Sequence, residues 1–539
     1  YVHDTSPSIF SRFQVCVLHK LNVGSRTPST TPLRLAESIS PFVNNLRVTS
    51  RLPSVQTEGV KPMSSTNGAI VVGTIRMGFG HHRIAYAATS WALGYNKPTY
   101  FHDLLNIDSP EATLIKDMDK NYSWMAHHLQ PLLLGLPKDT PIITSHCFVG
   151  LTAVSLGFTK VINLVIDNHA QWFIVVPGAY NLVQGPTNYH NLMRMGVPSD
   201  RLVLAGAWIP KELVDNIDSD CNRRIDRAEA RAARRLLIPV GGAGPFNLLQ
   251  CSLPRSLLPL SFPRLSPSLG SLSHYLPPRP YAARPRFPPR HAAWKRARVD
   301  VMRTLPPTGA QKKFVTSFVA ALKPHVLSGK VELMLNAGDH EHMRIAFLQA
   351  IKVIGVSYDV VDSIEGVHKF CDNARAGKLS NSSITLFTFK EPPRRNSLCF
   401  PLALVHHRHD YFPAVATTDL LSRVADALCC KPSELAFYPV PKLMIRRVGD
   451  HEAYSAIRAS ELGDGEYLYL NPHPNWTLEL RELSDALAYI QLMIEGPQLL
   501  IQMNDCIKAN NKARCEKIQL LCGGCAIYDA PNLSQSHPL

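Results

Sequence analysis

The feature that most constrains the fold of this chain is an alternation of short apolar runs with helical segments, which begins at residue 69. The run "AIVVGTI" (69–75) is rich in β-branched residues, as a buried parallel strand is, and a glycine-bearing turn follows it. In the next segment, "HRIAYAATSWALG" (82–94), apolar residues recur at helical spacing until Gly94. The sequence therefore predicts a strand, a turn and a helix in succession.

Four further strands are expected after this unit, at "KPTYFHDL", "TPIITSH", "VINLVID" and "RLVLAGA". Helical stretches over 111–135 and 185–195 separate some of them. Such an alternation of strands and helices predicts an α/β domain with a doubly wound parallel sheet. We therefore expect a Rossmann-like domain over residues 69–235.

A second series of the same kind begins at "RRLLIPVGGAGPFNLLQ", again a strand that runs into a glycine turn. It resumes beyond residue 307 with a helix and the strand "KVELMLNAGD", a helix over 341–353, and the strands "SYDVVD" and "SITLFTF". These segments predict a second Rossmann-like domain over 236–250 and 308–470, followed by a helical segment over 471–539. Two such domains in tandem bind ligands in a cleft between them, at the carboxyl ends of both sets of strands.

The net charge of +15 is concentrated in one stretch of unusual composition. Residues 251–300 contain eight arginines, one lysine, one aspartate and ten prolines, without a hydrophobic period. Because such a composition does not form a packed core, we interpret residues 251–307 as a disordered insertion and 390–410 as a second irregular loop. A nucleic-acid site presents its Lys and Arg side chains on a folded face, so no nucleic-acid partner is expected.

Residues 1–68 are rich in Ser, Thr and Arg and poor in acidic residues, which predicts a disordered or targeting segment such as an organelle transit peptide. The localisation stays open between the cytoplasm and an organelle. No apolar window is long enough for a membrane span, so contact with a membrane is expected to be peripheral.

The cysteines and histidines of the chain do not form a strong metal motif. Twelve cysteines at irregular spacings fit thiols in a reducing compartment better than a disulfide framework. The tail holds Cys506, Cys515, Cys522 and Cys525, but a lone "CGGC" is weak evidence for zinc, and "HHRHD" at 406–410 resembles a metal cluster by composition only. No metal ion and no cofactor are therefore expected.

The succession of motifs resembles a known family, the glycosyltransferases of the monogalactosyldiacylglycerol synthase and processive diacylglycerol glucosyltransferase type, which are relatives of MurG. The resemblance covers about 69–240 and, more loosely, 310–450. The positions that carry it are the turn residues Gly78, Gly80 and His81, the helix residues Ala85 and Ala87, the group Asp167, His169 and Trp172 in "LVIDNHAQWF", and the stretch "YNLVQGPTNYHNLMRMGVPSDRLVLAGAWIP". The chain departs from the family pattern at Phe79, which interrupts the glycine run, and at "KPSELAFYPVP", where the family has glycines.

The resemblance implies a GT-B enzyme that moves a sugar from a nucleotide-sugar to a lipid or lipid-linked hydroxyl without a bound metal. Glycosyl transfer needs a base, and an imidazole at a helix start stays neutral near pH 7. His81 is therefore the expected base, with Asp167 to orient it or bind the acceptor. The plainer interpretations are a helix-capping His81 and a turn-capping Asp167.

The remaining candidates follow from their positions at the carboxyl ends of strands. Acceptor contacts are expected from Gly80, His82, His146, His169 and Trp172. Donor contacts are expected from Gly241, Gly242 and Gly244, whose backbone N–H groups suit a diphosphate, and from Asn336, Lys431, Ser433 and Glu434. Two alternatives remain open: a nucleotide-sugar 2-epimerase on the same fold, and a degenerate protein that binds nucleotide-sugars without transfer.

Overall fold

The computed structural model of the 539-residue chain describes the greater part of both predicted series. The residues that it describes are 31–54, 59–64, 68–75, 79–107, 109, 129–171, 174–239, 310–378, 382–389, 412–445, 454–456, 459, 477–479 and 483–522. The predicted insertion 251–307 and the loop 390–410 lie outside these ranges, as does the "CGGC" motif.

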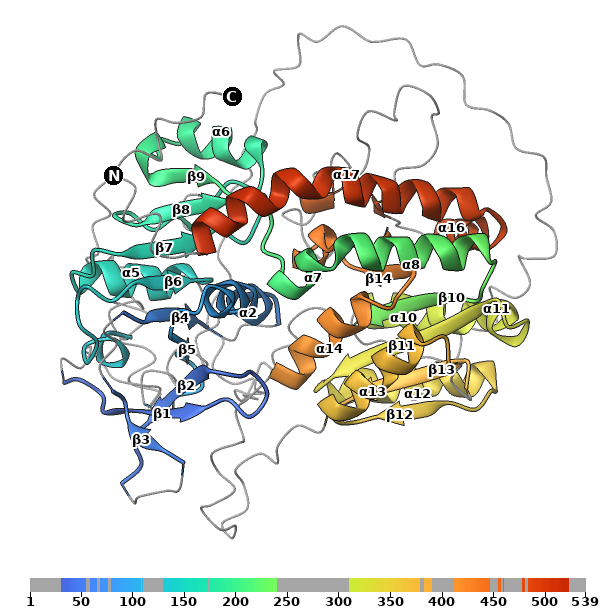
Figure 1. Cartoon of the computed structure of the whole chain (residues 1–539), viewed down its shortest axis with the longest axis horizontal. Helices are drawn as coiled ribbons and strands as arrows, with labels where there is room; N and C mark the ends of the chain where they lie inside the picture. Colours follow the sequence, from blue (N-terminus) through green and yellow to red (C-terminus); the bar gives the residue numbers. More distant parts are fainter. Residues whose placement is uncertain are drawn as a thin grey trace, which may run out of the picture. The chain divides into compact units, whose positions relative to one another are not determined.

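The first sheet is built from nine strands in the order β3-β1-β2-β5-β4-β6-β7-β8-β9 (Figure 1). Its strands are β1 (Leu35–Ile39), β2 (Leu46–Arg51), β3 (Lys61–Pro62), β4 (Ile70–Thr74), β5 (Thr99–Asp103), β6 (Ile142–Thr144), β7 (Val161–Leu164), β8 (Tyr180–Val183) and β9 (Leu202–Leu204). The helices between them are α2 (Phe79–Gly94), η1 (Gln130–Leu132), α5 (Cys147–Ser155), α6 (Pro186–Arg194) and η3 (Ser199–Arg201). All pairs from β2 to β9 are parallel.

The second sheet has seven strands in the order β12-β13-β11-β10-β14-β15-β16, all paired in parallel. Its strands are β10 (Arg234–Pro239), β11 (Val331–Gly338), β12 (Asp359–Val361), β13 (Ile384–Thr388), β14 (Ala427–Cys430), β15 (Lys442–Met444) and β16 (Thr477–Glu479). The helices of this part are α7 (Lys211–Asp215), α8 (Ile217–Glu229), α10 (Ala310–Ala321), α11 (Lys323–Leu327), α12 (Glu341–Ile354), α13 (Ile364–Arg375), α14 (Phe412–Ser422), η6 (Glu434–Phe437), α16 (Leu483–Glu495) and α17 (Pro497–Cys522). The predicted α/β class with parallel sheets is confirmed.

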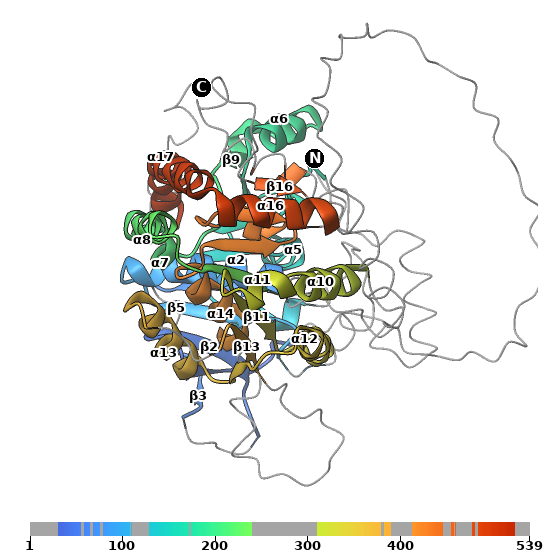
Figure 2. The same ribbon diagram turned by 90° about the vertical axis from the view of Figure 1, so that its right-hand side faces the viewer.

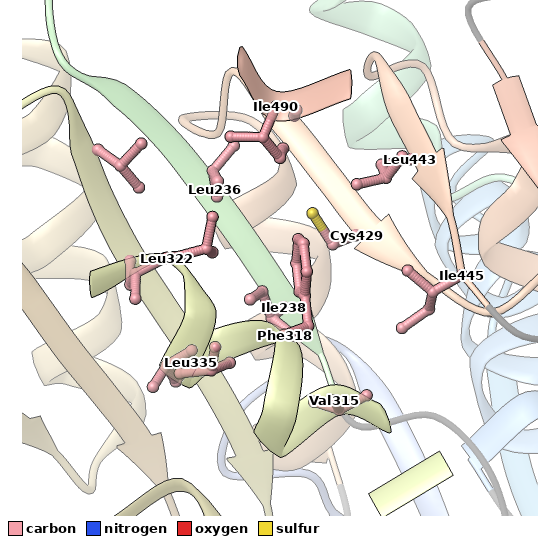
Figure 3. Close-up of a cluster of buried hydrophobic side chains, with 14 of the residues drawn as sticks. Leu236, Ile238, Val315, Phe318, Leu322, Leu335, Cys429, Leu443, Ile445 and Ile490 are labelled. Atoms are coloured by element: carbon pink, nitrogen blue, oxygen red, sulfur yellow. The ribbon is translucent and has the colours of Figure 1, made fainter. Parts of the chain in front are cut away.

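Helices cover both faces of each sheet, which is why the strands read as continuous apolar runs. Successive side chains of a strand point to opposite faces. Leu236 and Ile238 accordingly enter the core cluster with Phe318 of α10, while Leu237 packs with α13 and α14 on the other face (Figures 2 and 3). Burial of a side chain such as Phe318 contributes about 1.5–3 kcal/mol to stability.

The prediction of a disordered or targeting segment over 1–68 is wrong for residues 35–39, 46–51 and 61–62, which form strands. β1 pairs antiparallel with β2 and with β3, and β2 continues the parallel sheet next to β5. Asn45, at φ 64°, supports the turn between β1 and β2. Polar residues are interspersed among the apolar ones in these strands, as in LAESI and LRVTSR, so the stretch lacks the apolar run by which the later strands were found.

The segment after 471 is not purely helical, because β16 (477–479) pairs with β15 at one end of the second sheet. The helices α16 and α17 do follow it, and Ile490 and Met503 lie in the same core as Leu236. α8, which precedes the predicted boundary at 235, also packs into this core through Cys221. The second sheet is therefore covered in part by a helix that precedes β10 in the sequence and by helices that follow β16.

Candidate active site at the first sheet

The strand order of the first sheet predicts where a ligand binds. β4 lies between β5 and β6, so the chain leaves β4 toward one side for β5 and later returns to the other side for β6. In doubly wound sheets the loops that follow two such strands diverge, and they leave a crevice at the carboxyl ends. His81 follows β4 and His146 follows β6, so both imidazoles lie at this switch point.

His81 lies in the first turn of α2, and its side chain is half-buried. Its Nδ1 atom is 2.8 Å from the backbone carbonyl oxygen of Ser145. Since a carbonyl only accepts, Nδ1 carries the proton and donates it. In the neutral ring, Nε2 then holds the lone pair and acts as a proton acceptor.

His146 has the opposite tautomer. Its Nδ1 atom accepts a hydrogen bond from the backbone N–H of Phe148 at 3.2 Å and so caps the start of α5. The neutral ring therefore carries its proton on Nε2. Burial, and then the nearby His81, hold the pKa of His146 well below its ordinary value. The two rings lie 4.7 Å apart, so a proton acceptor and a potential donor stand side by side.

A close approach of β4 and α5 makes this pairing possible. A Cβ atom at Gly73 would lie 2.6 Å from Cγ1 of Val149, so only glycine fits at this point of β4. The hydroxyl groups of Thr74 and Ser145, which end β4 and follow β6, are hydrogen-bonded at 2.9 Å. These contacts fix the loop whose carbonyl holds His81.

His82 occupies a structural position rather than a ligand-facing one. Its side chain is 1% exposed, and Nε2 lies 2.6 Å from Oδ2 of Asp103 at the end of β5. Asp103 also accepts hydrogen bonds from the backbone N–H of Leu105 and the amide of Asn106. We therefore assign His82 to holding α2 on the sheet, although the sequence suggested acceptor contact.

Two further predicted site residues, Asp167 and His169, follow β7. Asp167 is half-buried, and its backbone carbonyl accepts a hydrogen bond from Asn188 at 2.8 Å. The His169 ring packs 4.8 Å from that of Tyr454. The Nδ1–H of His81 donates to the carbonyl of Ser145, and the expected role of Asp167, to orient His81 or to bind the acceptor, stays a prediction. Gly80 is half-buried in the first turn of α2, and Trp172 lies outside the described residues.

The second sheet has its own switch point, between β10 and β14. The predicted donor segments follow these two strands: Lys431 and Ser433 come after β14 and are half-buried. Gly241, Gly242 and Gly244 come after β10 and lie outside the described residues, as does the side chain of Glu434. Because β10 and β14 are neighbouring parallel strands, their carboxyl ends lie at one edge of the sheet.

Asn336, another donor candidate, is buried and bonded within the fold. Its Nδ2 donates to Oγ1 of Thr418 at 3.0 Å, and its Oδ1 accepts from the backbone N–H of Gly338 at 2.9 Å. The amide therefore shapes the end of β11 in this conformation.

The sequence pattern did not single out Arg83, which is 2% exposed. Its guanidinium donates to Asp419 Oδ1 at 2.9 Å and to the carbonyl of Val415 at 3.2 Å, both on α14. The available signal was one arginine within an otherwise apolar helix, because a buried charge requires a partner.

The part of the chain that the structure describes has neither a metal centre built from side chains nor a membrane-spanning helix. No group of three or more His, Cys, Asp or Glu side chains there is arranged to hold a metal ion. No helix in the same ranges has both the length and the apolar character of a membrane span. Among the described residues, Cys147, Cys221, Cys371, Cys429, Cys430 and Cys506 carry free thiols.

Two family models match the chain. The first, described as a domain of unknown function (DUF6938), matches residues 197–261, 289–394 and 401–517, which is more than half of the sequence. The second, also a domain of unknown function (DUF6937), matches 38–130 and 124–194. No curated protein matches the chain.

Proposed function

The chain belongs to the family DUF6938, and from the geometry of its own residues we propose that it is a glycosyltransferase. The proposed reaction moves a sugar from a nucleotide-sugar to a hydroxyl of a lipid or lipid-linked acceptor. The enzyme would be of the GT-B type, with acceptor bound by the first sheet and donor by the second. Membrane association would be peripheral.

The observation that carries this proposal is the orientation of His81. Its Nδ1–H donates to the Ser145 carbonyl at 2.8 Å, so the ring is held with Nε2 as the basic atom. In the proposed step the acceptor hydroxyl attacks the anomeric carbon, its proton passes to Nε2 of His81, and the nucleoside diphosphate leaves. A base placed in this way typically accelerates such a step about 10²- to 10⁴-fold.

His146 supports the same chemistry from the neighbouring loop. A ring that is kept neutral beside His81 adds no positive charge, so it does not suppress protonation of the base as a second imidazolium would. Its depressed pKa, caused mainly by burial, favours this neutral form.

The donor side of the proposal rests on topology. Glycine turns at the carboxyl end of a central parallel strand expose backbone N–H groups that bind diphosphates. The predicted donor glycines follow β10 and Lys431, Ser433 and Glu434 follow β14, the two strands that flank the second switch point, while Asn336 lies near the end of the neighbouring β11. A nucleoside diphosphate is therefore the ligand class that we assign to this sheet.

The test is an activity screen of nucleotide-sugars against diacylglycerol and other lipid acceptors, with two variants of His81. His81→Ala removes the ring, whereas His81→Asn keeps an N–H near the position of Nδ1 and removes the basic nitrogen. We expect both variants to lose turnover about 10²-fold or more. His190→Ala, on α6, is the matched control and should keep parental turnover.

Turnover of His81→Asn equal to that of the parent would remove His81 as the base. Conversion of free nucleotide-sugars without an acceptor would instead indicate an epimerase. Binding of nucleotide-sugars by calorimetry, without turnover for any acceptor, would indicate a binding protein that lacks transfer.

A further inference from the structure

Three consecutive residues at the start of α2 attach this helix to three different segments. His81 bonds to the Ser145 carbonyl after β6, and His82 bonds to Asp103 at the end of β5. Arg83 bonds to α14, which packs on the second sheet. The turn that carries the candidate base is therefore joined directly to the part of the chain assigned to the donor.

The contacts of Arg83 form a network that we call the Arg83 bridge, made of Arg83, Asn336, Thr418, Asp419 and Tyr438. One face of α14 supplies Thr418 and Asp419, since residues four or three positions after Val415 lie on the same side of a helix. Nη2 of Arg83 donates to Thr418 Oγ1 at 3.4 Å, and Asn336 donates to the same oxygen at 3.0 Å. One hydroxyl thus joins α2 to the carboxyl end of β11.

The second branch of the bridge reaches η6. The Tyr438 hydroxyl donates to Asp419 Oδ1 at 2.6 Å, the same oxygen that accepts from Arg83. Arg83 also lies over the Tyr438 ring, 5.8 Å from its centroid. Tyr438 ends η6, the helical turn that starts directly after Ser433 and contains Glu434. Both branches therefore end next to residues predicted to bind the donor.

Arg83 is held too tightly to be a surface contact. Its side chain is 2% exposed, and its guanidinium is fixed by a carboxylate, a carbonyl and two hydroxyl groups. A planar guanidinium makes several directed hydrogen bonds at once, which lysine does not reproduce. Displacement of η6 or of the end of β11 would have to move Arg83, and with it the first turn of α2.

We propose that Arg83 is a positioning residue that couples the donor side to His81, so that ligand binding near η6 and β11 changes the environment of the His81 ring. The identity of the ligand in this inference rests on the proposed function. The contacts of the Arg83 bridge do not depend on that function. A nucleoside diphosphate is the class of ligand that would act through it.

The test measures the reactivity of His81 itself, by peptide mass spectrometry after modification with diethyl pyrocarbonate over a range of pH. The variants are Arg83→Lys, which keeps the charge and loses the planar fork, and Tyr438→Phe, which removes one hydroxyl. The matched control is Arg234→Lys, because Arg234 is also 2% exposed but donates to the carbonyls of Met493, Arg227 and Ala232, none of which belongs to the bridge. We expect the rate at His81 to change at least threefold in Arg83→Lys, less but in the same direction in Tyr438→Phe, and not at all in the control.

A second arm adds uridine diphosphate as the probe. In the parent protein we expect it to alter modification of His81, and in Arg83→Lys we expect this effect to disappear although the probe still binds. An unchanged His81 rate in both bridge variants, or an undiminished nucleotide effect in Arg83→Lys, would overturn the coupling. If the probe does not bind the parent at all, the proposed function fails, while the variants without nucleotide still decide the role of the bridge.

Discussion

Gly73→Ala is the substitution that most directly tests how the first switch point is built. Gly73 lies in β4, where an added Cβ would be 2.6 Å from Cγ1 of Val149 on α5. Val149 is fully buried, and a β-branched side chain in a helix has essentially one rotamer, so it does not turn aside. α5 would have to move away from the strand, and it carries the cap formed by His146.

The expected cost follows from two opposing terms. Overpacking of a well-filled core costs about 1–3 kcal/mol. Replacement of glycine by alanine restricts the unfolded chain, which offsets about 0.4–1 kcal/mol. We therefore expect a net loss of about 1–2 kcal/mol in the free energy of unfolding. Val149→Ala alone removes two buried methyl groups and should cost about 1.5–3 kcal/mol.

The assay is urea unfolding of the parent, both single variants and the double variant, followed by circular dichroism. Alanine at 73 fits into the space left by the Val149 side chain, so the double variant should be more stable than the sum of the single losses predicts, by about 2 kcal/mol. Additive losses would refute the reasoning, because they would show that residues 73 and 149 do not compete for the same volume. Gly377→Ala is a suitable reference, since no atom lies near its Cβ position and its cost comes only from φ 69°.

Two further predictions concern buried titratable side chains, those of His102 and Asp426. Burial lowers the pKa of His102 from its ordinary value of 6.5 to about 4, so the folded state stays neutral where the unfolded state binds a proton. The stability that depends on the neutral His102 ring is present above about pH 6.5 and is lost as the pH falls toward 4. Between pH 7 and pH 5 the free energy of unfolding therefore falls by about 2 kcal/mol. Urea unfolding should show that His102→Asn loses less stability than the parent when the pH falls from 7 to 5. Equal losses in the two proteins would contradict this. Asp426→Ala removes the carboxylate that accepts from Arg227 at 3.1 Å and from the Arg235 N–H at 2.8 Å, and it should cost about 3–5 kcal/mol. An unchanged unfolding midpoint would show that α8 is held on the second sheet by other contacts.

The parallel strands were predictable because they are buried on both faces. β4, β7 and β10 are buried along their whole length and contain the short apolar runs IVV, VI and LLI, and runs of that kind are found without knowledge of their neighbours. The strands β1 to β3 were missed for the converse reason. Leu46 of β2 is buried, but polar residues surround it in the sequence, so the stretch resembles a solvated segment.

In the candidate site, too, some features could be predicted from the sequence and others could not. His81 could be singled out from the sequence because it stands where a predicted strand is followed by a predicted helix, at the carboxyl end of the strand. This rule uses only one strand and the helix that follows it in the sequence. The partner that fixes its tautomer is the backbone of Ser145, and a carbonyl has no residue-specific signature. The roles of His82 and Arg83 depend on Asp103 and on α14, which are distant in sequence, so spacing along the chain did not reveal them.

The tautomer of His81 is the property on which the proposed base depends most directly. Nitrogen chemical shifts of selectively labelled histidine, with His81→Asn to assign the signal, report which ring nitrogen carries the proton. The geometry predicts that the neutral ring carries its proton on Nδ1 and leaves Nε2 unprotonated. A neutral ring protonated on Nε2 instead would contradict the account.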